Sequence, residues 1–428
     1  MNSNERANEE QHQCCGGPAS NLLPVEQGRQ QILETVTALP QTQQLDLRHA
    51  LGRVLAEPVV SPINVPAYNN SAMDGYAVRS ADIQSDGDTR LEVVGSVLAG
   101  HPFSGELQPG QCVKIMTGAQ VPDALDTVVI KELCRCEKSS QQEFVIFPAG
   151  AKPGQNRRLA GEDLAVGSPA IGAGTRLGAA ELGMIASLGQ AEVCVTRKPR
   201  VAYFSTGDEI RSLGQPLEAG QIYDSNRYTV TAMLAGMGIE VIDLGVIADR
   251  PDAIEAAFKQ ASEQADVVLS SGGVSLGEAD FVKDCLDRLG QVGFWRLAMK
   301  PGRPLAFGHV GEALFFGLPG NPVAVMVSFL QFVKPALRKL GGENHWLPSE
   351  AQIRCTEPIR KRPGRTEYVR GIISHGADGQ PEVRSSGHQG SGILTSMSQA
   401  NCLIVLSDQQ SPVAAGDWVR VQPFDGLL

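Results

Sequence analysis

The sequence predicts a multi-domain protein of the α/β plus β class, with a doubly wound parallel sheet in its central domain. Between residues 196 and 345, apolar strand-like runs alternate with helix-like stretches, which is typical of βαβ units. Short strand-like runs separated by turns fill residues 61–154 and, again, residues 346–428. A chain of 428 residues is too long for one ordinary core, and its hydrophobic content of 42% is that of a globular protein.

The first half of the chain is expected to combine a linking domain with a β-rich insert. Residues 1–21 are polar and lack the apolar stretch of a secretory signal. Helical spacing runs through residues 24–39, and residues 45–59 suggest a second helix that leads into a strand. The segments we expect are a disordered tail at 1–21, a discontinuous linking domain at 22–60 and 155–195, an inserted β-rich domain at 61–154, an α/β domain at 196–345 and a C-terminal β-barrel domain at 346–428.

Strand-like runs and helix-like stretches alternate within the expected α/β domain. Helices between strands make crossover connections, which join parallel strands. After residue 345 the pattern returns to short strands, as in a small barrel. The expected strands of the α/β domain are 199–210, 239–247, 265–271 and 314–320, and the expected helices are 224–237, 251–265, 280–290 and 321–340.

Charge and cysteine content exclude several functional classes. A formal net charge of -10 argues against nucleic acid or an anionic membrane as the main partner, because neither attracts a net anion. No apolar run approaches the roughly 20 residues that a transmembrane helix needs. Cys134 and Cys136 form a C-x-C motif, but no second pair or histidine cluster completes a zinc site. We therefore interpret the nine scattered cysteines as reduced thiols of a cytosolic protein.

Three glycine-containing turns follow expected strands, where ligands of open α/β sheets bind. They are STGDE at 205–209, SSGGVSLGEAD at 270–280 and GLPGNP at 317–322. Acidic residues accompany these strand ends, and carboxylates beside an anion-binding turn need a cation such as Mg²⁺ between them and the anion. Each acid alone fits a helix N-cap equally well. The acids concerned are Asp208, Glu209, Asp249, Glu278 and Asp280.

A basic run at 295–304 adds a candidate oxyanion site. Lys300-Pro301-Gly302 presents a cation on a constrained turn, although an ordinary β-turn with solvated charges is the alternative. Arginines at 362, 365 and 370 and the polar loop 385–392 follow in the C-terminal part. Charge runs usually form a solvated face, so this second cluster is a weak signal on its own.

Other motifs favour no competing enzyme class. Gly273 to Gly277 matches the G-x-S-x-G motif of α/β-hydrolases, but Ser270, Ser271 and Gly272 separate it from the strand. The dinucleotide, Walker and zincin signatures are absent. In the first half, the turns around Asp74, Thr117 and Asp163 would each be ordinary turns on their residues alone.

Short motifs spread over residues 22–428 carry a family resemblance. They are, in order, SAMDGYA, MTGA, GED, STGDE, SGGVSLGEAD, MKPG, LPGNPV and GHQGSG. This set resembles the molybdopterin molybdenumtransferases (MoeA), to which the E domain of gephyrin is related. The resemblance implies a cytosolic homodimer with an elongated subunit of about four domains. It also implies an enzyme that exchanges molybdate into adenylylated molybdopterin with release of AMP, in a cleft between the α/β domain of one subunit and the insert of the other.

The resemblance also implies specific site residues. Ser270 to Asp280 would cradle the pyrophosphate, Glu209, Asp249 and Asp280 would hold Mg²⁺, and Lys300, Arg370 and Ser391 would bind molybdate. Two positions depart from the family pattern, since Arg296 replaces a lysine and Arg250 replaces a second acid. The implied catalytic residues are Asp74, Thr117, Asp163, Glu209, Asp249, Asp280 and Lys300. The implied substrate-binding residues are Ser271, Gly272, Gly273, Ser275, Arg296, Lys300, Pro301, Pro319, Pro322, Arg370 and Ser391.

Two alternatives remain open at this point. A molybdopterin adenylyltransferase would share the α/β domain, but it favours T-G-G-T-G in place of SSGGVSLG and needs neither the insert nor the barrel. A gephyrin-like scaffold would leave the acids and MKPG dispensable. The expected partners are the two substrates, a second copy of the chain and, transiently, other cofactor-synthesis proteins and acceptor molybdoenzymes. Neither nucleic acid nor membrane is an expected partner.

Overall fold

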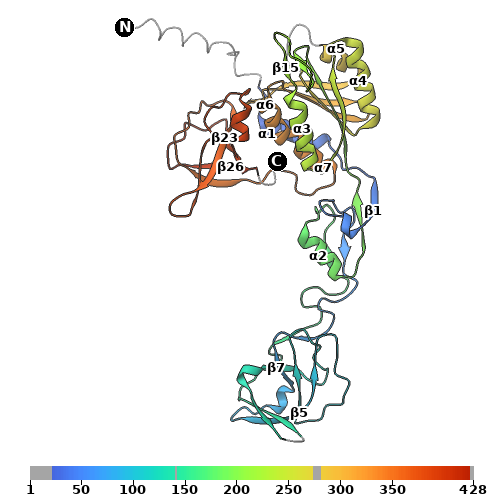
Figure 1. Cartoon of the computed structure of the whole chain (residues 1–428), viewed down its shortest axis with the longest axis vertical. Coiled ribbons are helices and arrows are strands. Elements are labelled where there is room, and N and C mark those ends of the chain that lie inside the picture. Colours follow the sequence, from blue (N-terminus) through green and yellow to red (C-terminus); the bar gives the residue numbers. More distant parts are fainter. Residues whose placement is uncertain (1–21, 140–141, 273–280, 425–428) are drawn as a thin grey trace. The chain divides into compact units, whose positions relative to one another are not determined.

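The computed structural model describes residues 22–139, 142–272 and 281–424 (Figure 1). The chain forms two compact units: one contains the residues up to Gln43 and from Thr196 onward, and the other contains Gln44–Val195. The domain boundaries expected from the sequence are finer than this division and stay a prediction. Among the described residues, no helix combines the length and the apolar character needed to cross a bilayer.

The unit Gln44–Val195 contains a β-rich sheet, as the sequence predicts. Its described strands pair in the order β7-β4-β6-β5-β9-β8. Apolar side chains pack on both faces, with Val113 and Ile115 in one cluster and Tyr76 and Cys112 in another. The strand bounds are β4 (Gly75–Val78), β5 (Thr89–Val97), β6 (Gln111–Ile115), β7 (Thr127–Ile130), β8 (Arg135–Lys138) and β9 (Glu143–Phe147).

Beyond this sheet, the described part of the unit includes short paired strands and the helix α2 (Ala179–Ser187). These pairings bring sequence-distant segments together, because the two members of each pair lie on opposite sides of the β-rich sheet in the sequence. The helix α2 precedes the last of these strands in the sequence. The pairs are β1 (Thr42–Asp46) with β12 (Glu192–Thr196), β2 (Val59–Val60) with β11 (Pro169–Ile171), and β3 (Asn70–Ser71) with β10 (Arg157–Arg158).

The prediction of a helix at residues 45–59 is wrong. Only a short 3-10 turn, η3 (Leu47–His49), forms there. The backbone N–H groups of Leu47, Gly52 and Leu55 instead donate to carbonyls of residues 191, 177 and 175, at 2.8, 2.8 and 3.0 Å. Gly52 has a φ of 72°, which a right-handed helix does not allow. Pairing with distant segments therefore replaces the local helical bonds that the apolar spacing suggests.

The other unit is built on a sheet with strand order β16-β13-β17-β21-β20-β18 in the described chain. The first four strands are parallel, as expected, whereas β20 and β18 run antiparallel to their neighbours. A two-residue turn at Gly311 and Glu312 joins β20 to β21, and so short a connection makes them antiparallel. The bounds are β13 (Arg200–Thr206), β16 (Glu240–Ile247), β17 (Val267–Ser271), β18 (Gly290–Arg296), β20 (Pro304–Val310) and β21 (Ala313–Leu318).

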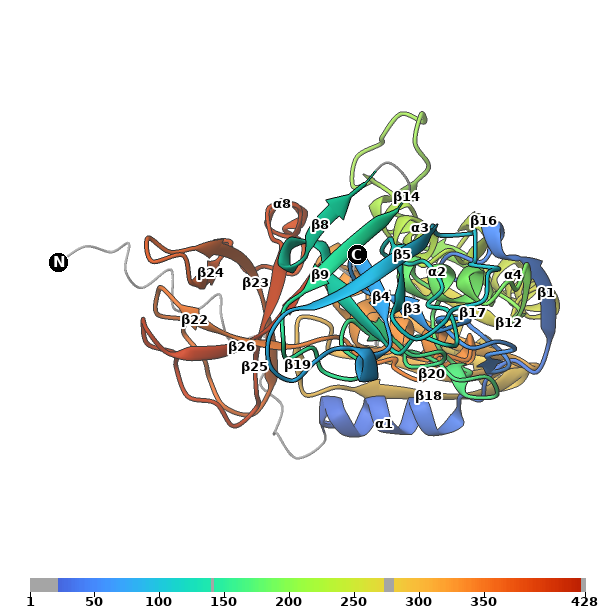
Figure 2. The same cartoon turned by 90° about the horizontal axis from the view of Figure 1, so that it is seen from below.

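Helices cover both faces of this sheet, so it is doubly wound. Alternate residues of β13 divide between the faces: Tyr203 packs in the core with α1, α3 and α6, and Phe204 packs in the core with α4 and α5. The helix α1 runs along β18, the last strand in the sheet order (Figure 2). Just before this helix, the Leu23 amide donates to the carbonyl of Arg296 in β18, at 2.8 Å. The bounds are α1 (Val25–Thr35), α3 (Ser225–Gly236), α4 (Pro251–Gln264), α5 (Phe281–Leu289) and α6 (Pro322–Ser328).

The long helix expected at 321–340 forms in three consecutive parts. The helix α6 passes into a π-helical segment at Phe329–Val333 and then into α7 (Lys334–Leu340). Pro335 has no N–H group for the ordinary helical bond to the carbonyl four residues earlier. A wider turn before the proline is a usual response to such a missing bond.

The C-terminal strands close into a barrel, which confirms the predicted architecture. Within the described chain, β23 pairs with β24, β24 with β22, β22 with β26, β26 with β25, and β25 again with β23. The short strand β19 (Met299–Lys300) adds to the barrel through β23. The bounds are β22 (Ala351–Cys355), β23 (Thr366–His375), β24 (Pro381–Ser385), β25 (Cys402–Leu406) and β26 (Trp418–Pro423), with helix α8 at Leu394–Ser398.

Candidate functional site

A cavity of about 570 Å³ lies where β13, β17 and β21 end. We call it the strand-end pocket. Parallel neighbours in a sheet end at one edge, so the turns that follow them face the same space. The volume lies within the usual range for small-molecule sites. Its lining includes Thr206, Glu209, Asp224, Asn226, Ser271, Gly272 and Pro322.

The close approach of two strand ends shapes the pocket floor. Ser205 of β13 lies opposite Ser271 of β17, so the two strands finish together. Gly272 follows with a φ of 91°, and a Cβ atom at this position would lie 2.4 Å from the Thr206 carbonyl oxygen. Only glycine combines that backbone angle with that contact. The glycine-rich turn that the sequence singled out therefore begins at a point where a side chain cannot fit.

Carboxylates gather at the β16 and β13 ends of the same edge. Burial and, next, the nearby charges of Asp208 and Glu209 raise the pKa of Asp249. Such mutual repulsion between hard oxygen donors is relieved by a bound cation. The described residues nevertheless contain no group of three acidic, histidine or cysteine side chains arranged to hold a metal.

Several sequence-predicted residues lie in the segment 273–280, outside the described residues. Among them is Asp280, the third expected metal ligand, so the described chain contains only Glu209 and Asp249 of that set. The other expected site residues in this segment are Gly273 and Ser275, and the further acid is Glu278.

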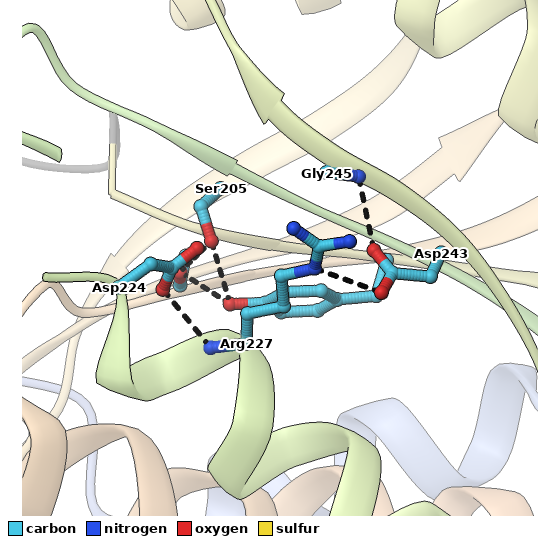
Figure 3. A network of polar contacts seen from close by, with 7 residues as sticks. Ser205, Asp224, Arg227, Asp243 and Gly245 are labelled. Carbon is cyan, nitrogen blue, oxygen red and sulfur yellow. Dashed lines mark hydrogen bonds and ion pairs between the residues drawn. The ribbon is translucent and has the colours of Figure 1, made fainter. Parts of the chain in front are cut away.

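The pocket also has buried polar atoms that the sequence did not reveal. Thr206 Oγ1, Asp224 Oδ2 and Asn226 Oδ1 have no hydrogen-bond partner within the described chain. All three residues are at least nine-tenths buried. Asp224 caps α3, because its Oδ1 accepts from the Arg227 amide at 3.0 Å (Figure 3). An aspartate directly before a helix is usually interpreted as a helix cap, so the sequence did not indicate that Asp224 also lines the pocket.

Lys300 and Arg370 lie together in a different cavity of about 300 Å³, which we call the basic pocket. The pairing of β19 with β23 brings Lys300 beside Glu367, and the Lys300 Nζ lies 3.4 Å from a Glu367 carboxylate oxygen. Half of the Lys300 side chain is exposed. Pro301 and Arg360 also line this cavity, so cations and carboxylates both face it. The strand-end pocket, by contrast, has no lysine or arginine in its described lining.

Arg370 is a buried cation, and its Nε and Nη2 groups donate to acceptors inside the protein. Its side chain donates to the carbonyls of His388 and Gly390, at 3.3 and 3.0 Å, and to the Ser396 hydroxyl at 3.2 Å. Burial lowers the pKa of Arg370 to about 10. These contacts hold the polar loop 385–392 against β23. In the described structure the guanidinium therefore organises a loop.

The remaining expected residues of this unit lie around the two pockets. The carbonyl of Ser391 accepts from the Val323 amide at the start of α6, and its neighbour Gly392 lines the strand-end pocket. Pro319 is buried directly after β21. Arg296 is exposed at the end of the edge strand β18.

In the unit Gln44–Val195, the structure brings Asp74 and Thr117 together. Asp74 accepts from the amide and the hydroxyl of Thr117 at 2.9 and 2.8 Å, and it lies 3.3 Å from Lys131 Nζ. The bonds from Thr117 and then from Lys131 lower the pKa of Asp74 to about 2. Asp163 lies on an exposed turn of the same unit. The turn signals at Asp74 and Thr117 thus belong to one hydrogen-bonded contact.

Three family models match this chain in succession. Residues 23–189 match the MoeA N-terminal region (domain I and II), residues 202–339 match a probable molybdopterin binding domain, and residues 352–424 match the MoeA C-terminal region (domain IV). A molybdopterin molybdenumtransferase of Haemophilus influenzae is 43% identical over 408 residues, which is 95% of this chain and 100% of that protein. The chain belongs to the MoeA family.

Further MoeA relatives support the assignment. The molybdopterin molybdenumtransferase of a Nostoc species is 40% identical over 389 residues, covering 89% of this chain and 88% of that protein. The crystal structure of a molybdopterin biosynthesis MoeA protein from Pyrococcus horikoshii matches 94% of this chain and 100% of that one, with a TM-score of 0.81 and 26% identity. MoeA proteins are transferases of molybdenum cofactor biosynthesis, so the chain is a member of an enzyme family. The sequence-based expectation of this family is confirmed.

Proposed function

We propose that this chain inserts molybdate into adenylylated molybdopterin and releases AMP. The observation that carries the proposal is the strand-end pocket, whose floor is a glycine that cannot be replaced and whose wall contains unpartnered buried oxygens. Unpartnered buried polar atoms cost free energy unless a ligand or water satisfies them. A polar, nucleotide-sized ligand supplies such partners.

Magnesium fits the carboxylates at this edge. Glu209 and Asp249, with Asp280, would hold the ion, and the raised pKa of Asp249 supports a place for positive charge there. Mg²⁺ bound at this position would neutralise charge on the phosphoanhydride of the substrate. The chain's own contribution is to orient the phosphates at Ser271 and Gly272.

The basic pocket is the proposed place for molybdate. Lys300 is the exposed cation there, and a dianion favours charged donors of this kind. Arg370 would act mainly by holding the loop that carries Ser391, because its Nε and Nη2 groups already donate to Ser396, His388 and Gly390. Pro301, Pro319, Pro322 and Arg296 stay predicted contacts of the two substrates.

The central experiment measures AMP release. Purified protein is mixed with adenylylated molybdopterin, molybdate and Mg²⁺, and we expect AMP together with a cofactor that reconstitutes a molybdoenzyme. An adenylyltransferase would instead consume ATP and release pyrophosphate. A scaffold protein would release no AMP, and its binding to a partner protein would be unchanged by Lys300→Ala. Absence of molybdate-dependent AMP release by the wild-type chain would reject the proposal.

The magnesium site has a test that does not depend on turnover. Titration calorimetry with Mg²⁺ should show weaker binding for Glu209→Gln. Glu240→Gln is the matched control, because Glu240 is exposed at the opposite end of β16 from Asp249. Equal Mg²⁺ affinity for the wild type and Glu209→Gln would remove Glu209 from the proposed metal site.

We further propose a cytoplasmic homodimer that makes transient contact with other cofactor-synthesis proteins and acceptor molybdoenzymes. Asp74, Thr117 and Asp163 are proposed as catalytic residues, and the Asp74–Thr117 contact is consistent with a shared role. Sedimentation velocity measures the oligomeric state. Thr117→Val, which keeps the side-chain shape but removes the hydroxyl bond to Asp74, tests the pair through AMP release.

A further inference from the structure

Three buried hydroxyl groups, those of Tyr203, Ser205 and Ser271, form a triangle near the ends of β13 and β17, and Figure 3 labels Ser205 among them. Tyr203 and Ser205 project from the same face of β13, since they are two residues apart, and the strand register places Ser271 of β17 beside Ser205. Tyr203, Ser205 and Ser271 are 0%, 1% and 3% exposed. Only Ser271 among them lines the strand-end pocket.

The three sides of the triangle differ in length. The Tyr203 and Ser271 oxygens are 2.6 Å apart, the Tyr203 and Ser205 oxygens are 3.0 Å apart, and the Ser205 and Ser271 oxygens are 3.3 Å apart. Hydrogen bonds between hydroxyls are most favourable near 2.7–2.8 Å, so the contact of Ser271 with Tyr203 is its strong one. The contact with Ser205 is its weak one.

A count of protons shows what a ligand would change. Each hydroxyl has one proton, so three protons serve three contacts when the triangle is complete. An acceptor in the pocket that takes the Ser271 proton leaves two protons for the two shorter contacts. The order of donation is then Ser205 to Tyr203, Tyr203 to Ser271, and Ser271 to the ligand, and only the longest contact is given up.

Tyr203 is suited to the middle position of this chain. Burial raises the pKa of Tyr203, so its hydroxyl keeps its proton across the physiological range. A phenol is also a better donor than an aliphatic alcohol, and donation into a hydroxyl strengthens that hydroxyl as a donor in turn. The ring itself is fixed in the core between β13 and the helices.

We infer that Tyr203 is a positioning residue, which holds the Ser271 hydroxyl so that its proton is directed to a phosphate oxygen of the nucleotide ligand. This inference rests on the proposed function, since it takes AMP as the ligand. Tyr203 does not touch the ligand, and Ser271 does.

Calorimetric binding of AMP and of adenosine tests the inference. Tyr203→Phe keeps the ring and removes the hydroxyl, and we expect it to weaken AMP binding about threefold to tenfold, the value of one hydrogen bond. Adenosine, which lacks the phosphate, should bind both proteins equally. Ser205→Ala is the matched control, because it removes the hydroxyl furthest from the ligand in the donation order, and it should change AMP binding by less than about twofold.

A double-mutant cycle separates positioning from a structural effect. If Tyr203 acts through Ser271, the double variant Tyr203→Phe/Ser271→Ala should bind AMP as weakly as Ser271→Ala alone. Additive losses, or an equal loss for adenosine, would overturn the inference, and the unfolding midpoint of each variant shows whether the fold is intact. If the wild-type chain releases AMP and Tyr203→Phe binds AMP with normal affinity, this inference is rejected but the proposed function is not. A wild-type chain that neither binds nor releases AMP rejects the proposed function as well.

Discussion

The substitution Arg370→Lys distinguishes a guanidinium that holds a loop from one that binds substrate. Arg370 uses its planar fork to reach two carbonyls and one hydroxyl of the segment 388–396. A lysine ammonium keeps the charge but occupies a single point, so it cannot satisfy acceptors spread along the fork. We expect it to retain one of the three bonds.

The size of the effect follows from the bonds that are lost. Hydrogen bonds from a charged donor contribute about 1.5–3 kcal/mol each, and neighbouring bonds are not additive. Losing two of them should lower the free energy of local opening of the loop by about 2–4 kcal/mol. Amide exchange through that opening should then be about 30-fold to 700-fold faster.

Hydrogen exchange followed by mass spectrometry measures this change directly. The amides to follow are those of Ser386 and Ser396, which are hydrogen-bonded in the described structure. Arg384→Lys is the control, because Arg384 is exposed and its side chain donates, within the described chain, only to the neighbouring Ser385 carbonyl. Unchanged exchange in Arg370→Lys, together with lost molybdate-dependent AMP release, would refute the loop-holding role and favour direct contact with substrate.

Three further predictions concern the other site residues. Gly272→Ala places a Cβ atom 2.4 Å from the Thr206 carbonyl at a φ of 91°, so it should abolish AMP release, whereas Gly320→Ala in the same pocket meets nothing within 4 Å and should be tolerated. Asp74 should titrate near pH 2 in a carbon-detected NMR experiment. The folded-state pKa of Asp74 lies below the ordinary value of 3.8, so its contribution to the free energy of unfolding is present above pH 3.8 and is lost as the pH falls toward 2. A titration midpoint at 3.8 would contradict the contact with Thr117. Glu209→Gln should lower the pKa of Asp249 by removing one of the charges that raise it, and the same titration would show no shift if the two carboxylates were independent.

The parallel core of the sheet was predictable because its signal is local. The strands β13, β17 and β21 are almost wholly buried, so each reads as a continuous apolar run between turns. The strands β18 and β20 were missed, and their glycines show why. A Cβ atom on Gly290 or Gly308 would lie 2.0 Å from a carbonyl oxygen of the facing strand. The sequence shows only glycine at these positions, and the neighbour that requires it is visible only in the folded sheet.

The same distinction applies to the site residues. Glu209, Ser271 and Gly272 were expected together because the ends of parallel strands meet at one edge, and they line one cavity. Lys300 and Arg370 share the other cavity only through the pairing of β19 with β23, and no local pattern predicts that pairing. Arg370 was assigned to substrate because the family resemblance implied it, whereas its arginine-rich segment was only a weak signal on its own. No sequence signal indicates that Arg370 is buried, and in its buried position the side chain donates to residues 388–396.

The charges of the two pockets bear on how an anionic substrate would be held. The described lining of the strand-end pocket contains the carboxylates of Glu209 and Asp224 and no basic side chain, so the charged side chains of this lining would repel a phosphate. The basic pocket contains Lys300, Arg360 and Arg370 beside the carboxylates of Glu357 and Glu367, so cationic side chains for an oxyanion are already present there. A substrate with a pyrophosphate would therefore depend on an added cation, whereas molybdate would not. This difference explains why a hydroxyl directed by Tyr203 matters at the acidic pocket: with no cationic side chain in the described lining, neutral donors such as Ser271 are the groups left to orient the phosphate.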